Sequence, residues 1–358
     1  MKLIVRRLKN KIRQLLPEHK IVQNLENTFK NNKDITSVVL MDLPTNGNLG
    51  DQALVYATKK FILQKIDGPI NLIEIPNTDI NSSLLFLRRK LKVNDVVIWN
   101  GGGNLGTIYP TAEFSRWSTF KILKNWRIIM FPQSVFFDSN KKTFLKKSVR
   151  FYRKKKDLSV YLREQKSFDS FSKNFALDNV SLVPDIVFSL ENNLPIKLPD
   201  SDKRSGIITL LRNDKEKSSF DNQKLISLLS KFDTVVQSDT YIDDVYVNDK
   251  NRDSLLIDKW EEIARHRLVV TDRLHGVIFA YLTKTPALVI PNNNWKIEST
   301  YETWLQDVKS IDILDVNTMN DKIIQSKIEL LMKANPEYIN VAQYFDQLSR
   351  EVNMIGKV

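Results

Sequence analysis

Short apolar runs alternate with helical patterns along the first half of the chain. The ranges 38–43 and 95–99 contain four consecutive apolar residues each, at 38–41 and 96–99, which is typical of strands buried on both faces of a sheet. Each run leads into polar residues and then into a segment with helical spacing. The order strand, loop, helix predicts a parallel sheet covered by helices. The strands expected here are 38–43, 95–99, 126–131, 158–162 and 180–183.

The second half repeats this alternation after a stretch rich in proline and polar residues, 192–202, which is expected to be a linker. The predicted fold class is α/β, with two Rossmann-like domains that each contain a parallel sheet. Strands are expected at 207–211, 234–237, 267–271, 287–290 and 310–313, and helices at 221–231, 258–265 and 298–306. The expected divisions are a basic helical segment 1–30, a first domain 31–198, a second domain 199–317 and a helical segment 318–358.

The strand at 267–271 ends where a helix begins, and this junction carries Arg273 and His275. Open α/β sheets bind ligands at the carboxyl ends of their strands, and a helix N-terminus offers free N–H groups to an anion. Arg273 adds a fork of donors suited to phosphate or carboxylate, and His275 can carry a proton near neutral pH. The pattern predicts an anion site with an acid–base residue, although a helix cap with a surface ion pair would give the same pattern.

Arg212 and Lys296 also follow strands of the second domain. Because parallel strands share one carboxyl edge, Arg212, Arg273, His275 and Lys296 are expected to converge. Three permanent cations and a histidine suit a small substrate with both a phosphate and a carboxylate, such as phosphoenolpyruvate. The alternative is four independent surface residues.

Two glycine-rich loops follow strands of the first domain, and the cluster 132–134 follows a third strand. The first loop lacks the GxGxxG spacing of dinucleotide-binding proteins. Close approach of the backbone to a ligand explains both loops, although a plain turn explains the first equally well. The three consecutive glycines of the loop 100–106 are costly in chain entropy, which favours a functional loop. The candidate residues are Gly47, Asn48, Gly50, Asp51, Gly101, Gly102, Gly103, Asn104 and Gln133.

Composition narrows the class of protein. The chain of 358 residues has no cysteine and three histidines, so disulfides and thiol chemistry are excluded and a metal site is not expected. Its hydrophobic content of 42% is that of a globular protein with a large core. No apolar run approaches the ~20 residues that span a bilayer, and no signal peptide is recognisable, which indicates a cytoplasmic location.

The net charge of +12 favours phosphorylated substrates, polyanions or membrane surfaces as partners, although a lysine-rich genome composition would also explain it. Residues 1–16 form a basic amphipathic pattern that is expected to pack on the protein or on a second subunit, with the inner face of the cell membrane as the alternative. The run 141–156 fits a solvated helix face, an acidic acceptor or a membrane. Nucleic acid is not expected, because no recognised motif accompanies the charge.

Together these strand-end motifs resemble the polysaccharide pyruvyltransferases. Arg273 and His275 match the donor-site RLH motif of that family, and Arg212 matches its first donor-site arginine. Lys296 lies in an Asn-rich version of a region that in the family contains aspartate and proline. The resemblance spans roughly residues 38–304, and the order and spacing of the motifs are more specific than any one of them. The matching motifs are 47–53, 100–104, 131–134, 163–164, 183–185, 212–213, 271–276 and the region of Lys296.

The resemblance implies a two-domain arrangement like that of the GT-B glycosyltransferases, with the active site in the interdomain cleft. It implies phosphoenolpyruvate as donor and a sugar of a surface-polysaccharide precursor as acceptor on the side of the first domain, with a pyruvate ketal as product. Arg212, Arg273 and Lys296 are expected to bind the donor and His275 to protonate it, without a metal or cofactor. A lipid-diphosphate-linked acceptor and an oligomeric state are left open.

Two other functions fit part of the pattern. A GT-B glycosyltransferase that uses a nucleotide sugar would share the fold and the basic cleft, but the second domain shows no obvious nucleotide-recognition site. A basic, membrane-associated assembly protein of the polysaccharide machinery would need no donor site at all.

Overall fold

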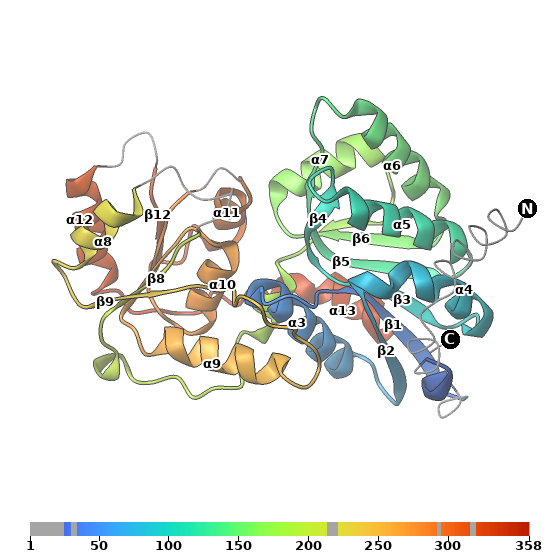
Figure 1. Ribbon diagram of the computed structural model, residues 1–358, viewed down its shortest axis with the longest axis horizontal. Helices are drawn as coiled ribbons and strands as arrows, with labels where there is room; N and C mark the ends of the chain where they lie inside the picture. The colour runs from blue at the N-terminus through green and yellow to red at the C-terminus, as the bar shows by residue number, and fades with distance from the viewer. Residues whose placement is uncertain (1–24, 30–33, 213–220, 292–294, 316–319, 358) are drawn as a thin grey trace, which may run out of the picture.

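Two α/β domains lie side by side, each built around one sheet (Figure 1). The computed structural model describes residues 25–29, 34–212, 221–291, 295–315 and 320–357. The paired strands of both sheets run parallel. The predicted α/β class, with two Rossmann-like domains that each contain a parallel sheet, is therefore confirmed. The expected N-terminal helix at 1–16 lies outside the described residues.

The first sheet has the strand order β2-β1-β3-β5-β6-β7, with β4 beside β5. Alternate residues of β1 enter different cores, because Val38 and Leu40 pack on the face covered by α3, whereas Val39 and Met41 pack under α4 to α7. The strands are β1 (Thr36–Leu43), β2 (Ile70–Pro76), β3 (Val96–Trp99), β4 (Gly102–Gly106), β5 (Arg127–Phe136), β6 (Leu158–Leu162) and β7 (Val180–Leu182). The helices are α3 (Leu49–Lys65), η1 (Asn77–Asp79), α4 (Ile80–Lys90), α5 (Pro110–Ile122), α6 (Lys142–Lys154), α7 (Gln165–Phe175) and η2 (Ile186–Leu190).

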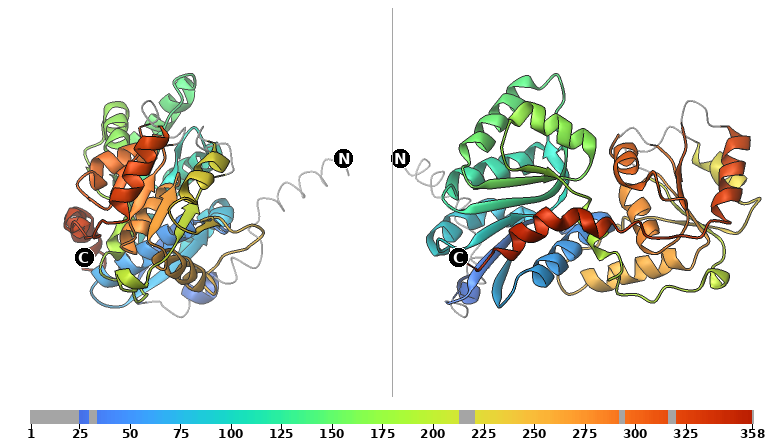
Figure 2. Two further views of the ribbon diagram at one scale, coloured as in Figure 1. Left: turned by 90° about the vertical axis from the view of Figure 1, so that its left-hand side faces the viewer. Right: turned by 180° about the vertical axis from the view of Figure 1, so that it is seen from behind.

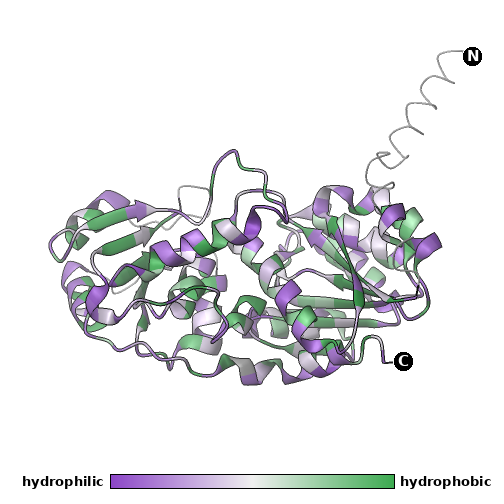
Figure 3. Ribbon diagram, turned by 90° about the horizontal axis from the view of Figure 1, so that it is seen from below, coloured by the Kyte–Doolittle hydropathy of each residue, from purple (hydrophilic) through white to green (hydrophobic). Residues whose placement is uncertain are grey.

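The second sheet has the order β12-β11-β10-β8-β9, so the strand that precedes Arg273 lies at its centre. Figure 3 shows that apolar residues concentrate in the strands of both sheets. The outer helices carry both hydrophilic and hydrophobic residues along their length (Figure 3). The strands are β8 (Ile207–Leu210), β9 (Val235–Ser238), β10 (Leu268–Thr271), β11 (Ala287–Val289) and β12 (Ile311–Ile313). The helices are η3 (Ser201–Lys203), α8 (Asn222–Leu229), α9 (Arg252–Ala264), α10 (Leu274–Leu282), α11 (Lys296–Thr300), η4 (Tyr301–Leu305), α12 (Asp321–Leu331), η5 (Val341–Phe345) and α13 (Asp346–Asn353).

The structure corrects three local predictions. The glycine run expected as a loop becomes strand β4, where Gly102 and Gly106 adopt positive φ angles of 155° and 115° and the chain pairs with β5. A Cβ atom on Gly106 would lie 2.0 Å from the Phe136 carbonyl oxygen, so only glycine allows this pairing. Strand β5 continues through the cluster 132–134 instead of ending before it. Helix α9 begins at Arg252, six residues earlier than expected.

The chain crosses between the domains twice. The first crossing follows η2, and the second follows α12, after which η5 and α13 pack on the first domain (Figure 2). Glu191, at the first crossing, accepts hydrogen bonds from the Tyr281 hydroxyl (2.7 Å) and from the backbone N–H of Asn340 (3.1 Å) at the second crossing. The described part of the segment 318–358 is therefore divided between the two domains.

Backbone hydrogen bonds join the domains directly. The N–H of Ile242 donates to the Gly47 carbonyl (2.9 Å), and the N–H of Leu49 donates to the Thr240 carbonyl (2.7 Å). From α9, the buried Arg252 donates through Nε to the Gln52 side chain of α3 (2.8 Å). None of the helices that the structure describes has the length and apolar character needed to cross a bilayer.

Replacement of Arg252 by methionine tests this interface. The change leaves the Gln52 acceptor unpaired in a buried contact, so we expect the free energy of unfolding to fall by about 1.5–3 kcal/mol in urea titrations. Arg265→Met is the control, because Arg265 is 69% exposed and pairs only with Glu261 on the surface. That control should cost less than about 1 kcal/mol. An equal loss in the free energy of unfolding for the two variants would contradict a stabilising role of the contact between Arg252 and Gln52.

Candidate active site

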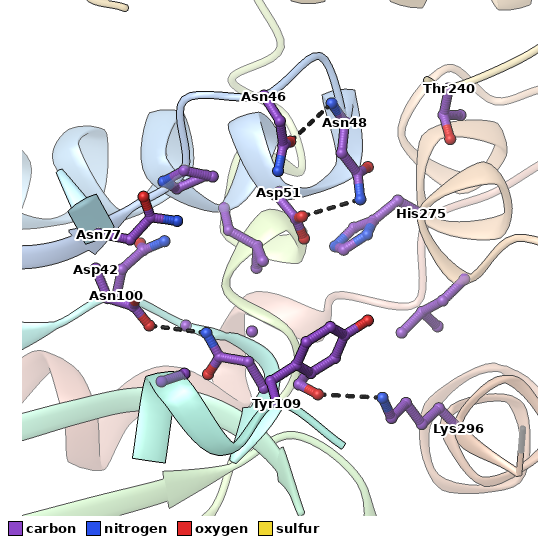
Figure 4. Close-up of a pocket in the computed structure, with 18 of the residues that line it drawn as sticks. Asp42, Asn46, Asn48, Asp51, Asn77, Asn100, Tyr109, Thr240, His275 and Lys296 are labelled. Carbon is purple, nitrogen blue, oxygen red and sulfur yellow. Dashed lines mark hydrogen bonds between the residues drawn. The ribbon is translucent and has the colours of Figure 1, made fainter. Parts of the chain in front are cut away.

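A cavity of about 540 Å³ lies between the domains, where the strands of both sheets end (Figure 4). This volume falls within the roughly 300–1,000 Å³ that is usual for small-molecule sites. The first domain contributes the start of α3, the run 100–104 and the start of α5. The second domain contributes the ends of β8 and β10 and the start of α11. Two groups of strand ends therefore face one another across a space large enough for two small substrates.

Arg273 and His275 stand at the start of α10, as the pattern predicts. The Arg273 N–H donates to the Thr271 hydroxyl (3.0 Å), which holds the turn between β10 and α10. Its guanidinium donates through Nη2 to Asp239 (2.6 Å), while its buried Nε has no hydrogen-bond partner among the described residues. Arg212 is placed by its own N–H, which donates to Asp272 (2.8 Å). An anion in the cavity would satisfy the remaining Arg273 donor.

A carboxylate from the first domain faces the His275 ring. Nε2 of His275 lies 3.6 Å from Oδ2 of Asp185, and the Arg163 guanidinium donates to the same oxygen at 2.7 Å. Burial alone would raise the pKa of Asp185, but Arg163 and His275 outweigh it and hold that pKa at about 2. Asp185 is therefore charged at neutral pH and presents a negative charge to the His275 ring.

The glycine loop before α3 packs against this histidine. A Cβ atom on Gly50 would lie 2.3 Å from Nδ1 of His275, so the ring occupies the space that a side chain would need. Gly47 plays the same part against the other domain, because its Cβ would lie 1.9 Å from the Ile242 carbonyl oxygen. Both glycines thus permit close contact between domains and do not line the cavity.

Asp51 and Asn48 carry the polar groups that this loop presents to the cavity. The Asn48 amide donates to Asp51 (2.9 Å), and its side-chain oxygen caps α3 by accepting from the Gly50 N–H (3.1 Å). Figure 4 shows the His275 ring extending from α10 toward Asp51. Burial raises the pKa of Asp51, and the positive charges of His275 and Arg163 partly offset this effect.

Lys296 reaches across the cleft to the second glycine run. Its Nζ donates to the Gly103 carbonyl (3.2 Å), and a Cβ on Gly103 would lie 3.0 Å from that Nζ and 3.1 Å from Nη2 of Arg163. The absence of a side chain at Gly103 therefore lets two cations from different domains approach the same stretch of backbone. This places Lys296 in the same cavity as Arg212, Arg273 and His275.

A buried network fixes the floor of the cavity on the first-domain side. Asp42 accepts from the Trp99 indole (2.9 Å) and from the Asn104 amide (2.8 Å), and Arg116 lies 3.8 Å away. Burial raises the pKa of Asp42 in spite of that arginine. Arg116 also binds the Asn104 side chain, so the orientation of Asn104 is determined from both sides.

Ten of the thirteen candidate residues line the cavity, and their chemical roles stay predictions. The other three are Gly47, Gly50 and Gln133, which do not line the cavity, and their place at a ligand stays a prediction. Gln133 is fully buried within β5 and donates to the carbonyls of Asn100 (2.7 Å) and Phe131 (2.9 Å), which supports the glycine run from behind. The ten lining residues are Asn48, Asp51, Gly101, Gly102, Gly103, Asn104, Arg212, Arg273, His275 and Lys296.

Sequence reasoning assigned no role to Arg163 or Asp185, although both stand in motifs that matched the resemblance. Each follows a strand end, so the rule that selected Arg273 would have selected them as well. Within the ranges described, no group of three or more histidine and carboxylate side chains is arranged to hold a metal ion.

The fold and the site together define a two-domain α/β protein with a cationic cavity between its sheets and a histidine–carboxylate pair that joins them. Residues 48–294 match the family model "Polysaccharide pyruvyl transferase", and the chain belongs to this family. General stress protein 30 of Bacillus subtilis is 30% identical over 320 residues, which are 88% of this chain and 91% of that protein. Pyruvyl transferase 1 of Schizosaccharomyces pombe is 27% identical over 293 residues, which are 76% of this chain and 70% of that protein.

A solved structure shares the fold. A functionally uncharacterized protein from Klebsiella pneumoniae superimposes with a TM-score of 0.51 at 19% identity, covering 83% of this chain and 98% of that chain. At this identity the likeness supports the two-domain architecture and nothing finer.

The Asp185 carboxylate should make stability depend on pH in a defined direction. Because its folded-state pKa of about 2 is below the usual 3.8, its contribution is present above about pH 4 and is lost as the pH falls through about 2. A lowering of this size corresponds to about 2 kcal/mol. The deficit of Asp185→Asn in urea unfolding should therefore be largest near neutral pH and should shrink in acid.

Asp200→Asn is the matched control, since Asp200 is exposed beside Lys203. Asp200→Asn should show no comparable loss in the free energy of unfolding, either near neutral pH or in acid. A deficit of Asp185→Asn that did not change with pH would contradict the ion-pair account.

Proposed function

We propose that the protein transfers the pyruvyl group of phosphoenolpyruvate to two hydroxyls of a sugar in a polysaccharide precursor and forms a pyruvate ketal. The observation that carries this proposal is the gathering of Arg163, Arg212, Arg273, Lys296 and His275 in one cavity. Four permanent cations beside a histidine match a donor with a phosphate, a carboxylate and a carbon to be protonated. Membership of the family supports pyruvyl transfer to a polysaccharide.

The donor would bind at the second-domain end of the cavity. The unpartnered Nε of Arg273 supplies one donor group, and the Arg212 and Lys296 side chains supply two more charges. Arginine suits this task because its fork is planar and remains charged. With the phosphate neutralised by these side chains, the proposed reaction requires no metal or cofactor.

The acceptor sugar would bind at the first-domain end. There the cavity is lined mainly by amides, hydroxyls and one ring, with the Asp42 carboxyl group at its floor, and all of these polar groups can form hydrogen bonds with sugar hydroxyls. Tyr109 is 47% exposed and offers a face on which a sugar ring can pack. The residues of this end are Asn46, Asn77, Thr78, Asn100, Tyr109 and Ser115.

The first chemical step is protonation of the donor. His275, in its protonated form beside Asp185, gives a proton to the methylene carbon of phosphoenolpyruvate, and the neighbouring carbon becomes an oxocarbenium-like centre. A sugar hydroxyl oxygen bonds to that centre, and its proton passes to Asp51. Asp51 suits this role because its pKa is raised and it stands opposite the histidine.

The second step completes the ketal. Inorganic phosphate leaves with the proton held by Asp51, as the bond between the ketal carbon and the phosphate oxygen breaks. A second hydroxyl of the sugar then bonds to the same carbon and returns a proton to His275. Both residues end in their starting states, so the cycle needs no external acid or base.

Donor binding is tested by calorimetric titration with phosphoenolpyruvate. Arg273→Ala should raise the dissociation constant at least tenfold, since a buried, charge-assisted contact is lost. Arg267→Ala is the control, because Arg267 is exposed just before β10, at the opposite end of the strand from the cavity. If the protein bound a nucleotide sugar and not phosphoenolpyruvate, the assignment of phosphoenolpyruvate as donor would be wrong and a glycosyltransferase would be favoured.

The acid and base roles are tested by steady-state kinetics. His275→Ala and Asp51→Asn should each lower kcat by about 10²–10⁴-fold while phosphoenolpyruvate still binds. Asp51→Asn should also remove the loss of activity at low pH, because Asp51 must be unprotonated to accept the sugar proton and its pKa is raised. His266→Ala, at the end of α9 where His266 Nδ1 meets the Glu262 carbonyl, is the control. Turnover near that of the wild type in either site variant would refute its role.

A further inference from the structure

The net charge of the chain is concentrated in one segment. Residues 77–157 contain 17 Lys and Arg but only five Asp and Glu, an excess equal to the +12 of the whole chain. Residues 158–358 contain 25 Lys and Arg and 30 Asp and Glu, an excess of five negative charges. A general lysine bias would add positive charge to both parts. The segregation therefore points to a local role for the charge.

The segment contributes one helical layer of the first domain. Helices α4, α5 and α6 pack side by side on the same face of the sheet, opposite the face covered by α3 (Figure 1). We call these three helices and the loops at their ends the basic layer. Helix α6 and its flanks carry most of the exposed charge, at Lys141, Lys142, Lys146, Lys147, Arg150, Arg153, Lys154 and Lys156. The first turn of α6 has no acidic residue to balance them.

Aromatic side chains lie between the cations of this layer. The rings of Trp117 and Phe151 stack at 5.3 Å between centroids, and Lys147 lies 4.7 Å from the Trp117 ring. Phe114 continues the cluster and is 47% exposed. The layer also has exposed aliphatic residues, since Leu85 in α4 is 57% exposed and Val93, in the loop after α4, is 91% exposed. Partly exposed aromatic rings among lysines and arginines suit the headgroup region of a bilayer.

The basic layer also borders the cavity. Thr78, just before α4, and Tyr109 and Ser115, at the start of α5, line the end of the cavity that we assign to the acceptor. If the basic layer bound to a surface, the acceptor end of the cavity would therefore lie closer to that surface than the donor end.

We propose that the basic layer docks the protein on an anionic lipid bilayer. Lysine and arginine side chains attract anionic headgroups, and each adds to the binding when it lies close to the surface. The exposed Phe114, Leu85 and Val93 add an apolar component that salt does not screen. The inference does not depend on the identity of the donor, so its failure leaves the proposed reaction standing.

Vesicle co-sedimentation of the full chain tests the proposal. The wild type should bind vesicles of phosphatidylcholine with phosphatidylglycerol, and should bind much less to phosphatidylcholine alone. A fourfold variant of α6, with Lys142, Lys146, Arg150 and Lys154 each replaced by Gln, should lower the partition coefficient by about fivefold for each charge removed. Phe114→Ser should weaken the binding that persists at high salt.

The control variant removes four exposed lysines of the second domain, Lys231, Lys250, Lys322 and Lys333, by the same change to Gln. It has the same net charge as the α6 variant and keeps the same N-terminal segment. Equal binding by the wild type and the α6 variant, or an equal loss in the control, would overturn the proposal. Binding to dextran sulfate without binding to anionic vesicles would also overturn it and would point to a soluble polyanion.

Discussion

The buried carboxylate of Asp185 is the point at which the two domains and the site depend on one another. A charge removed from water must be compensated by close partners, and here those partners come from both sides of the cleft. Arg163, from the first domain, binds it at 2.7 Å, and His275, from the second domain, faces the same oxygen. A contact between the domains therefore also places the histidine beside a charged carboxylate. The position of the domains and the surroundings of His275 both depend on this one oxygen atom.

Much of the architecture could be predicted because parallel sheets impose strong rules. Strands buried on both faces appear as continuous apolar runs, and their carboxyl ends must meet at one edge. That rule predicts that the four residues Arg212, Arg273, His275 and Lys296 converge, and the structure places all of them in the cavity. Strand β2 and helices α4 and α5 were not predicted. In β2 buried residues alternate with half-buried ones at the sheet edge, so the strand has no continuous apolar run.

The glycines show where sequence reasoning reaches its limit. A glycine reveals that something approaches the backbone closely, but not what approaches. At Gly50 the neighbour is the His275 ring, and at Gly47 it is the backbone of the other domain. Both neighbours are more than 190 positions away in the chain, so no local pattern could identify them. The end of the strand before Gln133 was predicted too early for a related reason, because β5 continues through a polar cluster that resembles a strand end.

The double crossing of the chain between the domains has a mechanical consequence. Two covalent connections that pass through neighbouring points remove most of the ways in which two rigid bodies can move apart. Glu191 fastens these connections to each other, since it binds Tyr281 and the backbone of Asn340. If the contacts across the cleft were broken, the two domains would still be held together at this point, and the strand ends of both sheets would remain near the same cavity.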